Sequence, residues 1–202
     1  MEWKSHFQAR SLQHIRYVVD VSLILASSSP RRHELLIAAG IPHIVQPTSI
    51  CEDRLGSEPP EAYVRRLAEA KARAAHASPS DIVLGADTAV FIDDEILGKP
   101  IDAHDAARML RLLSGRDHWV HTGICLLKGT RVVVDAACTM VSFAELTDSE
   151  IQEYTQSGEP AGKAGAYAIQ GQASKFVRSI CGSYHNVVGL PVSLVYSHLR
   201  TL

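Results

Sequence analysis

The chain has 202 residues, of which 20 are Lys or Arg and 22 are Asp or Glu, so its formal net charge is −2. This length is sufficient for a sizeable core, in one domain or in two lobes around a cleft. The balanced charge and the lack of a basic block argue against a nucleic-acid polymer as a partner. The four cysteines show no C-x-x-C spacing, which indicates reduced thiols in a cytoplasmic protein and neither a disulfide framework nor a zinc site.

The first residues raise the question of export. Basic residues precede an apolar stretch, Tyr17 to Ala26, as they do in a signal peptide. Asp20 interrupts this stretch, and cleavage near Ala26 would remove a predicted strand. We therefore expect residues 1–20 to be an N-terminal extension or a misassigned start of a cytoplasmic protein. No segment approaches the roughly 20 apolar residues of a membrane span.

The stretch Leu23 to Gly40 predicts a buried strand, a turn and a helix. Ser29 suits the N-cap and Pro30 the first helical position. Arg31 and Arg32 fall in the first turn, where positive charge opposes the helix dipole at a cost of roughly 0.3–1 kcal/mol per charge. A bound anion reverses the sign, because backbone N–H groups, serine hydroxyls and two guanidinium groups converge on it. The pattern suggests a phosphate site; the alternative is two solvated arginines.

Residues 41–49 predict a strand interrupted by two prolines, and residues 61–77 predict a helix. Its apolar face is expected to comprise Tyr63, Leu67, Ala70 and Ala74. Lys71 shares this face, four residues after Leu67. It either lays its stem on the core with its ammonium in solvent, or points into a cleft.

Residues 81–92 carry the strongest strand signal, and Asp87 lies in the middle of it after two small residues. An unpaired carboxylate in an apolar strand is costly, so Asp87 requires a metal, a cation or solvent. This requirement points to a functional site. The acidic residues 93–95 predict a hairpin turn and not a metal cluster. Lys99 follows the hairpin and is expected to return toward Asp87.

The rest of the chain continues the alternation of strands and helices, which predicts an α/β class with a mixed sheet. His118 and His121 would face opposite sides of their strand, so a shared metal is not expected. The predicted elements are a helix over 102–114, strands over 119–127 and 131–143 joined by a hairpin, a helix from a capping box at 147–150 to 158, a strand over 176–180 and a last helix after Pro191.

The stretch 158–171 is rich in glycine and contains Lys163 and Gln170. It is not a P-loop, because one residue is missing between its glycines and Ala164 stands where a Ser or Thr would hold magnesium. A glycine-rich loop with one lysine and one glutamine still suits the close approach of a backbone to a ligand.

Together these stretches resemble the Maf family of nucleoside triphosphate pyrophosphatases. The matching motifs cover the chain from about Ser22 to its end, so we expect one Maf-like domain over residues 21–202. Two positions depart from the family pattern: Ala168, where glycine is usual, and Gly162, where aspartate often precedes the lysine. The motifs are LASSSPRR at 25–32, GADT at 85–88, LGKP at 97–100, LSGR at 113–116, KAGAY at 163–167, IQG at 169–171 and GSYHNVVGLP at 182–191.

The resemblance implies an elongated α/β protein with two lobes around a cleft, similar to the inosine triphosphate pyrophosphatase fold. It implies hydrolysis of a nucleoside triphosphate to monophosphate and pyrophosphate with a divalent metal, Mg²⁺ or Mn²⁺. Asp87 would accept the proton of the attacking water, and Glu52 and Asp87 would hold the metal; whether Asp87 serves metal, water or both stays open. The residues expected to bind substrate phosphates are Ser27, Arg31, Arg32, Lys71 and Lys99.

The combination of Arg31, Thr88 and Gln170 resembles the subfamily that acts on dTTP and UTP. The amide of Gln170 would match the donor and acceptor edge of uracil or thymine, or else brace the glycine-rich loop. Two other functions stay open: a pyrophosphatase for methylated or other modified nucleotides, and a non-catalytic nucleotide-binding regulator of septum formation. No membrane partner is expected, and a homodimer stays open.

Overall fold

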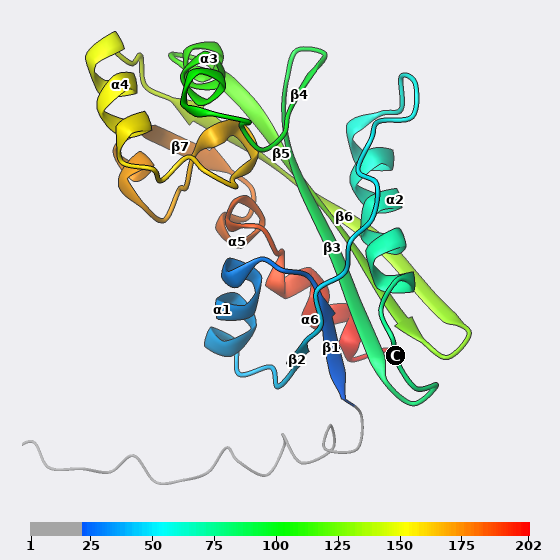
Figure 1. The fold of residues 1–202 in the computed structure, drawn as a ribbon. Coiled ribbons are helices and arrows are strands. Elements are labelled where there is room, and N and C mark those ends of the chain that lie inside the picture. The colour runs from blue at the N-terminus through cyan, green and yellow to red at the C-terminus, as the bar shows by residue number, and fades with distance from the viewer. Residues whose placement is uncertain (1–21) are drawn as a thin grey trace, which may run out of the picture.

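The structure is a computed structural model that describes residues 22–202, so the predicted N-terminal extension lies outside the described residues. A seven-stranded sheet forms its centre, with helices on both faces (Figure 1). The strands are β1 (Leu23–Ala26), β2 (Ile44–Val45), β3 (Ile82–Ile92), β4 (Glu95–Leu97), β5 (Asp117–Lys128), β6 (Arg131–Phe143) and β7 (Val177–Cys181). The helices are α1 (Pro30–Ala38), α2 (Pro60–Arg73), α3 (Ala103–Leu113), α4 (Asp148–Gln156), α5 (Tyr184–Val188) and α6 (Val192–Leu199), with short 3₁₀ helices η2 (Ala164–Ala166) and η3 (Gln172–Phe176).

The sheet is mixed, as expected. Its strands follow the order β2-β1-β3-β5-β6-β7, and β4 also pairs with β3. β1 runs parallel to β2 and to β3, whereas β3, β5, β6 and β7 pair antiparallel with one another in turn. Both expected hairpins, β3–β4 and β5–β6, are confirmed. The α/β class with a mixed sheet is therefore confirmed.

Alternate side chains of β3 pack against different helices, because successive residues of a strand point to opposite faces. Val83 packs with Ala68 and Ala72 of α2. Leu84 packs on the other face, with Leu36 of α1 and Val195 of α6. In Figure 1, α2 accordingly lies on one side of the long strands and α1, α5 and α6 on the other.

One edge of β3 is paired in two separate pieces. β1 pairs with residues 82–85 and β4 with residues 90–92, while β5 lies along the opposite edge from residue 82 to residue 91. Residues 86–89 therefore have no strand partner on the first edge within residues 22–202. This break in the sheet edge contains Asp87 and Thr88.

Two glycines allow α2 to approach the sheet unusually closely. A Cβ atom at Gly85 would lie 2.6 Å from the Ala72 amide nitrogen, and one at Gly123 would lie 2.7 Å from the Arg65 amide nitrogen. Real Cβ atoms do not make contacts this short. Only glycine is therefore compatible with α2 in its present position.

The same close approach explains why the expected face of α2 is wrong. The helix buries Val64, Leu67, Ala68 and Ala72, and of the expected set only Leu67 is buried. Small side chains must face the glycines, and this rotates the helix away from the face that a count of apolar residues indicates. The helix also ends at Arg73, earlier than expected.

The expected strand over residues 41–49 is reduced to the two residues of β2. Pro42 and Pro47 flank it, and proline has no N–H for a strand ladder. α5 was not predicted from the sequence, because five residues are too few to show a helical period.

The predicted helix over residues 102–114 is confirmed as α3, and the side chains that it buries, Ala106, Met109, Leu110 and Leu113, follow the helical period. The capping box is also confirmed. The Thr147 hydroxyl accepts the Glu150 N–H, and the Glu150 carboxylate accepts the Thr147 N–H. No helix within residues 22–202 is long and apolar enough to cross a membrane.

Candidate active site

The turn from β1 to α1 forms one wall of a cavity of about 240 Å³. Pro30 occupies the first turn of α1 and Ser29 is its N-cap, as expected, although the Ser29 hydroxyl caps no helix amide. The Ser29 N–H instead donates to the Ser27 hydroxyl, over 3.3 Å. The Ser27 hydroxyl accepts this bond and keeps its own O–H to donate. This O–H and the free N–H groups at the helix start are donors around a turn that an anion can enter.

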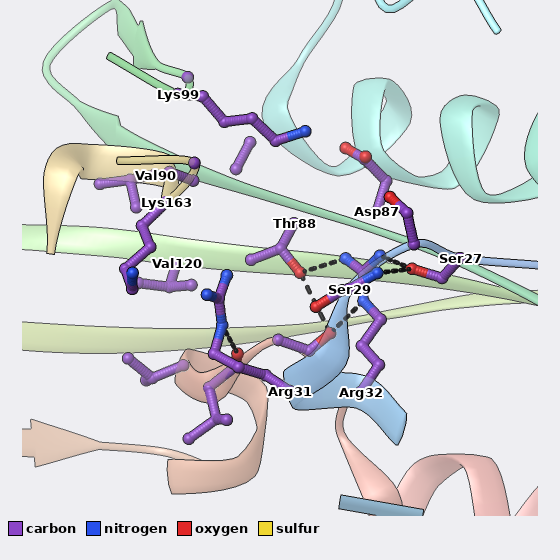
Figure 2. A pocket seen from close by; sticks show the side chains of 18 of the residues that line it. Ser27, Ser29, Arg31, Arg32, Asp87, Thr88, Val90, Lys99, Val120 and Lys163 are labelled. Atoms are coloured by element: carbon purple, nitrogen blue, oxygen red, sulfur yellow. Dashed lines mark hydrogen bonds between the residues drawn. The ribbon is translucent and has the colours of Figure 1, made fainter. Parts of the chain in front are cut away.

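Arg32 is buried in the break of the β3 edge, so the alternative of a solvated side chain is wrong for it. Its guanidinium donates to the Ser27 hydroxyl and to the Ala86 carbonyl, over 2.8 and 2.9 Å. It also donates to the Thr88 hydroxyl over 3.0 Å and to the Gly189 carbonyl over 2.8 Å. Figure 2 shows this network around Arg32. Arg32 therefore connects the β1 turn, the unpaired edge of β3 and the segment between α5 and α6.

Arg31 is half-buried and lines the same cavity. Its Nε donates to the Val188 carbonyl over 3.4 Å, so the end of α5 supports both arginines. Burial lowers the pKa of Lys163, and the nearby Arg31 charge lowers it further, which places these two cations close together. Figure 2 shows the two side chains extending toward one another from different segments of the chain.

Lys71 joins two carboxylates on the α2 side of the sheet. Its Nζ lies 2.6 Å from an oxygen of Asp87 and 2.6 Å from an oxygen of Glu52. The side chains of Lys71 and Asp87 are 12% and 9% exposed, so the alternative of a lysine with its ammonium in solvent is wrong. Lys71 points into the cavity because α2 lies against Gly85 and Gly123.

The two carboxylates differ in environment. Burial raises the pKa of Asp87, despite the opposing charges of Lys71 and Arg32. Burial also opposes ionisation of the more exposed Glu52, but the hydrogen bond and charge of Lys71 outweigh it and lower the pKa of Glu52. Asp87 is thus the better proton acceptor near neutral pH, since a general base works best when its pKa approaches the working pH.

Glu52 and Asp87 also fit a divalent cation by the chemistry of their donors. Both already share a single cation, the Lys71 ammonium, and carboxylate oxygens are the ligands that Mg²⁺ and Mn²⁺ prefer. Within residues 22–202, no group of three or more His, Cys, Asp or Glu side chains could hold a metal. The protein would therefore supply two carboxylates, and a substrate or water would supply the remaining ligands.

The structure brings all the site residues expected from the sequence to this one cavity. Gln170 and Lys99 are exposed at it, and Figure 2 shows Lys99 reaching toward the side of Asp87. The Thr88 hydroxyl is not free to contact a ligand, because it already has protein partners. It lies 3.0 Å from Arg32 and 2.9 Å from the Thr122 hydroxyl. The expected set is Ser27, Arg31, Arg32, Glu52, Lys71, Asp87, Thr88, Lys99 and Gln170.

Lys163 and Tyr63 are polar residues of the cavity that were given no site role from the sequence. Lys163 lines it, and the only sequence signal was a lysine within the glycine-rich stretch. Tyr63 also lines it and donates from its hydroxyl to the Glu52 carbonyl over 2.9 Å, which fixes the loop that carries Glu52. Burial and the nearby carboxylates of Asp87 and Glu52 raise the pKa of Tyr63 to about 12, so the hydroxyl keeps its proton.

A cavity lined by five cationic side chains and two carboxylates can hold a polyanion together with one divalent cation. The cations Arg31, Arg32, Lys71, Lys99 and Lys163 outnumber Glu52 and Asp87, so the cavity attracts negative charge. The buried carboxylate beside this charge can take a proton from a water molecule. Hydrolysis of a phosphoric anhydride fits this chemistry.

Known proteins resemble the chain over almost the whole of the described part. The family model described as Maf-like protein matches residues 22–202. A "dTTP/UTP pyrophosphatase" of Koribacter versatilis is 49% identical over 187 residues, which cover 92% of this chain and 97% of that protein. Proteins of the same name from a Geobacter species and from Symbiobacterium thermophilum are 52% and 51% identical, over 90% and 84% of this chain and 95% and 88% of their own.

Proposed function

Because the chain belongs to the family of Maf-like proteins, we propose that it is a pyrophosphatase that hydrolyses dTTP and UTP to the monophosphate and pyrophosphate. The observation that carries this proposal is the buried Asp87 carboxylate, held by Lys71 at the edge of a cation-lined cavity. About 50% identity to proteins named dTTP/UTP pyrophosphatase supports the choice of substrate.

The reaction breaks the anhydride bond between the α- and β-phosphates. A water molecule supplies its oxygen to the monophosphate, pyrophosphate leaves, and Asp87 accepts the proton of the water. The raised pKa of Asp87 suits this role, since burial brings its proton affinity closer to that needed near neutral pH. No serine or cysteine nucleophile is required, because water attacks directly.

Glu52 and Asp87 are the residues that would hold Mg²⁺ or Mn²⁺. When bound, the divalent cation neutralises charge on the triphosphate. Lys71 contacts both carboxylates, so it is placed to exchange one of these contacts for a phosphate oxygen as the substrate enters. The carboxylates thereby keep Lys71 in the cavity before the substrate arrives.

Two kinds of residue would stabilise the phosphates: those that face them directly and one that supports the wall of the cavity. Arg31, Lys71 and Lys99 present cations at the cavity, and the Ser27 hydroxyl lies at the β1 turn. Arg32 acts mainly by supporting the wall of the cavity, because its guanidinium makes four hydrogen bonds to protein groups. Its charge still favours an anion at this wall, while its geometry holds Ser27 and the edge of β3 in place.

The base would be recognised by Gln170. Its side chain is exposed at the cavity, and within residues 22–202 its amide has no hydrogen-bond partner, so the alternative of an amide that braces its own loop finds no support. Uracil and thymine offer an N3–H donor between two carbonyl acceptors, which an amide oxygen and amide N–H can match. Thr88 would act through Arg32, and Arg31 lies at the same wall.

Some expectations remain predictions: two lobes around the cleft, a cytoplasmic location and a homodimer.

A turnover assay distinguishes the proposed function from its two alternatives, a modified nucleotide as substrate and a non-catalytic regulator of septum formation. The experiment incubates the purified full-length chain with UTP, dTTP, CTP, GTP and a methylated purine triphosphate, and measures pyrophosphate and orthophosphate separately. Pyrophosphate from UTP and dTTP, abolished by a chelator and restored by Mg²⁺ or Mn²⁺, is the expected result.

Three outcomes would contradict the proposal. Orthophosphate as the first product would show a different bond cleavage. Full turnover in the chelator would remove the metal from the mechanism. Binding of UTP without any turnover would favour the regulator.

A further inference from the structure

The turn that presents Gln170 is attached to the rest of the protein on both of its sides. Gln170 lies in a backbone turn closed by the Gly171 N–H, which donates to the Ala168 carbonyl over 3.0 Å. On the near side, the Ala168 N–H donates to the hydroxyl of Tyr154 over 3.2 Å. On the far side, the Gln172 N–H donates to the carboxylate of Glu159 over 3.1 Å.

These two acceptors are joined to each other. The Tyr154 hydroxyl donates to the Glu159 carboxylate over 2.8 Å. Burial raises the pKa of Tyr154, so its hydroxyl stays protonated, and hydrogen bonds from Gln172 and Tyr154 lower the pKa of Glu159 although burial opposes this. A protonated hydroxyl beside an ionised carboxylate fixes the direction of the hydrogen bonds: tyrosine donates to glutamate and accepts from Ala168.

The fit around this pair is tight. Tyr154 is 1% exposed and packs edge-on against Phe176 at the end of η3, with ring centroids 5.4 Å apart. A Cβ atom at Gly171 would lie 2.5 Å from each oxygen of the Glu159 carboxylate. The residue after Gln170 must therefore be glycine for the carboxylate to reach the N–H groups of η3.

Neither Tyr154 nor Glu159 lines the cavity, whereas Gln170 does. A glutamine amide presents an acceptor on one side and donors on the other, so an amide that can turn over also matches cytosine. The backbone turn beneath the amide sets the place and the angle at which the amide meets the edge of the base. Preference for uracil over cytosine therefore depends on support of this turn from behind.

We propose that Tyr154 and Glu159 are positioning residues for base selection, holding the turn of Gln170 so that its amide reads uracil or thymine and rejects cytosine. This inference rests on the proposed function, because it concerns the selectivity of the same site. Tyr154 and Glu159 affect only the recognition of the base, through Gln170. The hydrolysis of the phosphate anhydride depends on Asp87 and the cationic side chains.

The test compares kcat and KM for UTP and CTP in the full-length chain and in Tyr154→Phe and Glu159→Gln. Tyr154→Phe removes the hydroxyl, whereas Glu159→Gln removes the charge and replaces one acceptor oxygen with an N–H donor. Both variants keep the size of the side chain. The ratio of kcat/KM for UTP to that for CTP should fall by about three- to tenfold, the scale of one lost hydrogen bond, mainly through a higher KM for UTP. Gly171→Ala displaces the carboxylate without removing a polar group and should lower the ratio similarly.

Matched controls make the same chemical changes elsewhere. Tyr196→Phe alters a tyrosine that is 54% exposed on α6, and Glu153→Gln alters an exposed glutamate on α4. Both should leave the UTP-to-CTP ratio unchanged. Thermal unfolding of every variant confirms that it is folded.

Two results would overturn the inference. One is an unchanged ratio in Tyr154→Phe and Glu159→Gln while Gln170→Ala lowers it. The other is an equal loss of activity with UTP and CTP, which indicates general loosening and not base selection. Failure of the proposed function is distinguished from both, because the unmodified chain would then release no pyrophosphate from UTP.

Discussion

Replacing Gly85 with alanine tests the claim that the close approach of α2 creates the catalytic arrangement. The added Cβ would lie 2.6 Å from the Ala72 amide nitrogen and 2.8 Å from the Ala72 Cβ, and ordinary contacts begin near 3.4 Å. Both atoms belong to the rigid part of α2, so the helix must retreat by at least about 0.8 Å from the sheet. Lys71 moves with it.

The magnitude follows from what Lys71 contacts. Its Nζ lies 2.6 Å from both Asp87 and Glu52, so a displacement of this size breaks or stretches both ion pairs. Overpacking of this kind costs about 1–3 kcal/mol of stability, which lowers Tm by about 2–12 °C for a chain of this length. A misplacement near 1 Å in the site costs about 10²-fold in turnover.

The assay measures pyrophosphate release from UTP and thermal unfolding of the same preparations. Gly98→Ala is the matched control for stability, because its Cβ would meet no atom within 4 Å and its backbone needs no positive φ. We expect it to leave Tm within about 1 °C, as surface substitutions usually do. A Gly85→Ala protein with unchanged Tm and turnover would refute the argument that helix approach positions Lys71.

Other perturbations test separate parts of the account. Asp87→Asn should lower kcat by at least about 10²-fold with an unchanged circular dichroism spectrum; near-normal turnover would remove Asp87 from its role. Lys99→Ala should lower kcat/KM by about 10²–10³-fold, because one cation facing developing charge is lost, and a loss below tenfold would contradict this. Burial lowers the pKa of His118 from 6.5 to about 4. Between these two pH values the unfolded chain binds a proton that the folded chain excludes, so the free energy of unfolding should fall as the pH drops from 6.5 to about 4. His118→Leu should make this pH dependence less steep, and an equally steep dependence in the variant would disprove the argument. A chain without residues 1–20 should turn over UTP within about twofold of the full chain, whereas loss of folded protein would show that these residues pack on the core.

The sequence was sufficient to predict those features that depend on neighbouring residues. The capping box at Thr147 and Glu150 and the hairpin after β3 use local hydrogen bonds and turn chemistry, and both are present. The grouping of the site residues in one cavity was expected from the resemblance to the Maf family, whose motifs include Ser27, Arg31, Arg32, Asp87 and Lys99.

Features that depend on distant partners could not be predicted. The rotation of α2 is set by Gly85 and Gly123 on two other elements, and no count of apolar residues within the helix contains that information. The role of Arg32 as a buried link depends on the Ala86 and Gly189 carbonyls, which lie 54 and 157 residues away along the chain. The sequence around Arg32 alone fits a solvated side chain equally well.

The break in the edge of β3 also has a mechanical consequence. The β1–α1 turn and the β4 hairpin with Lys99 are attached to β3 on the two sides of the break, and no backbone ladder within residues 22–202 joins them directly. A triphosphate that contacts both sides acts as a brace across the missing length of strand. Bound substrate should therefore slow amide hydrogen exchange in β4 more than in β5, whose ladder with β3 is continuous over residues 82–91. When pyrophosphate leaves, the contact across the break is lost. Release of the product and increased motion of the β4 hairpin should therefore occur together.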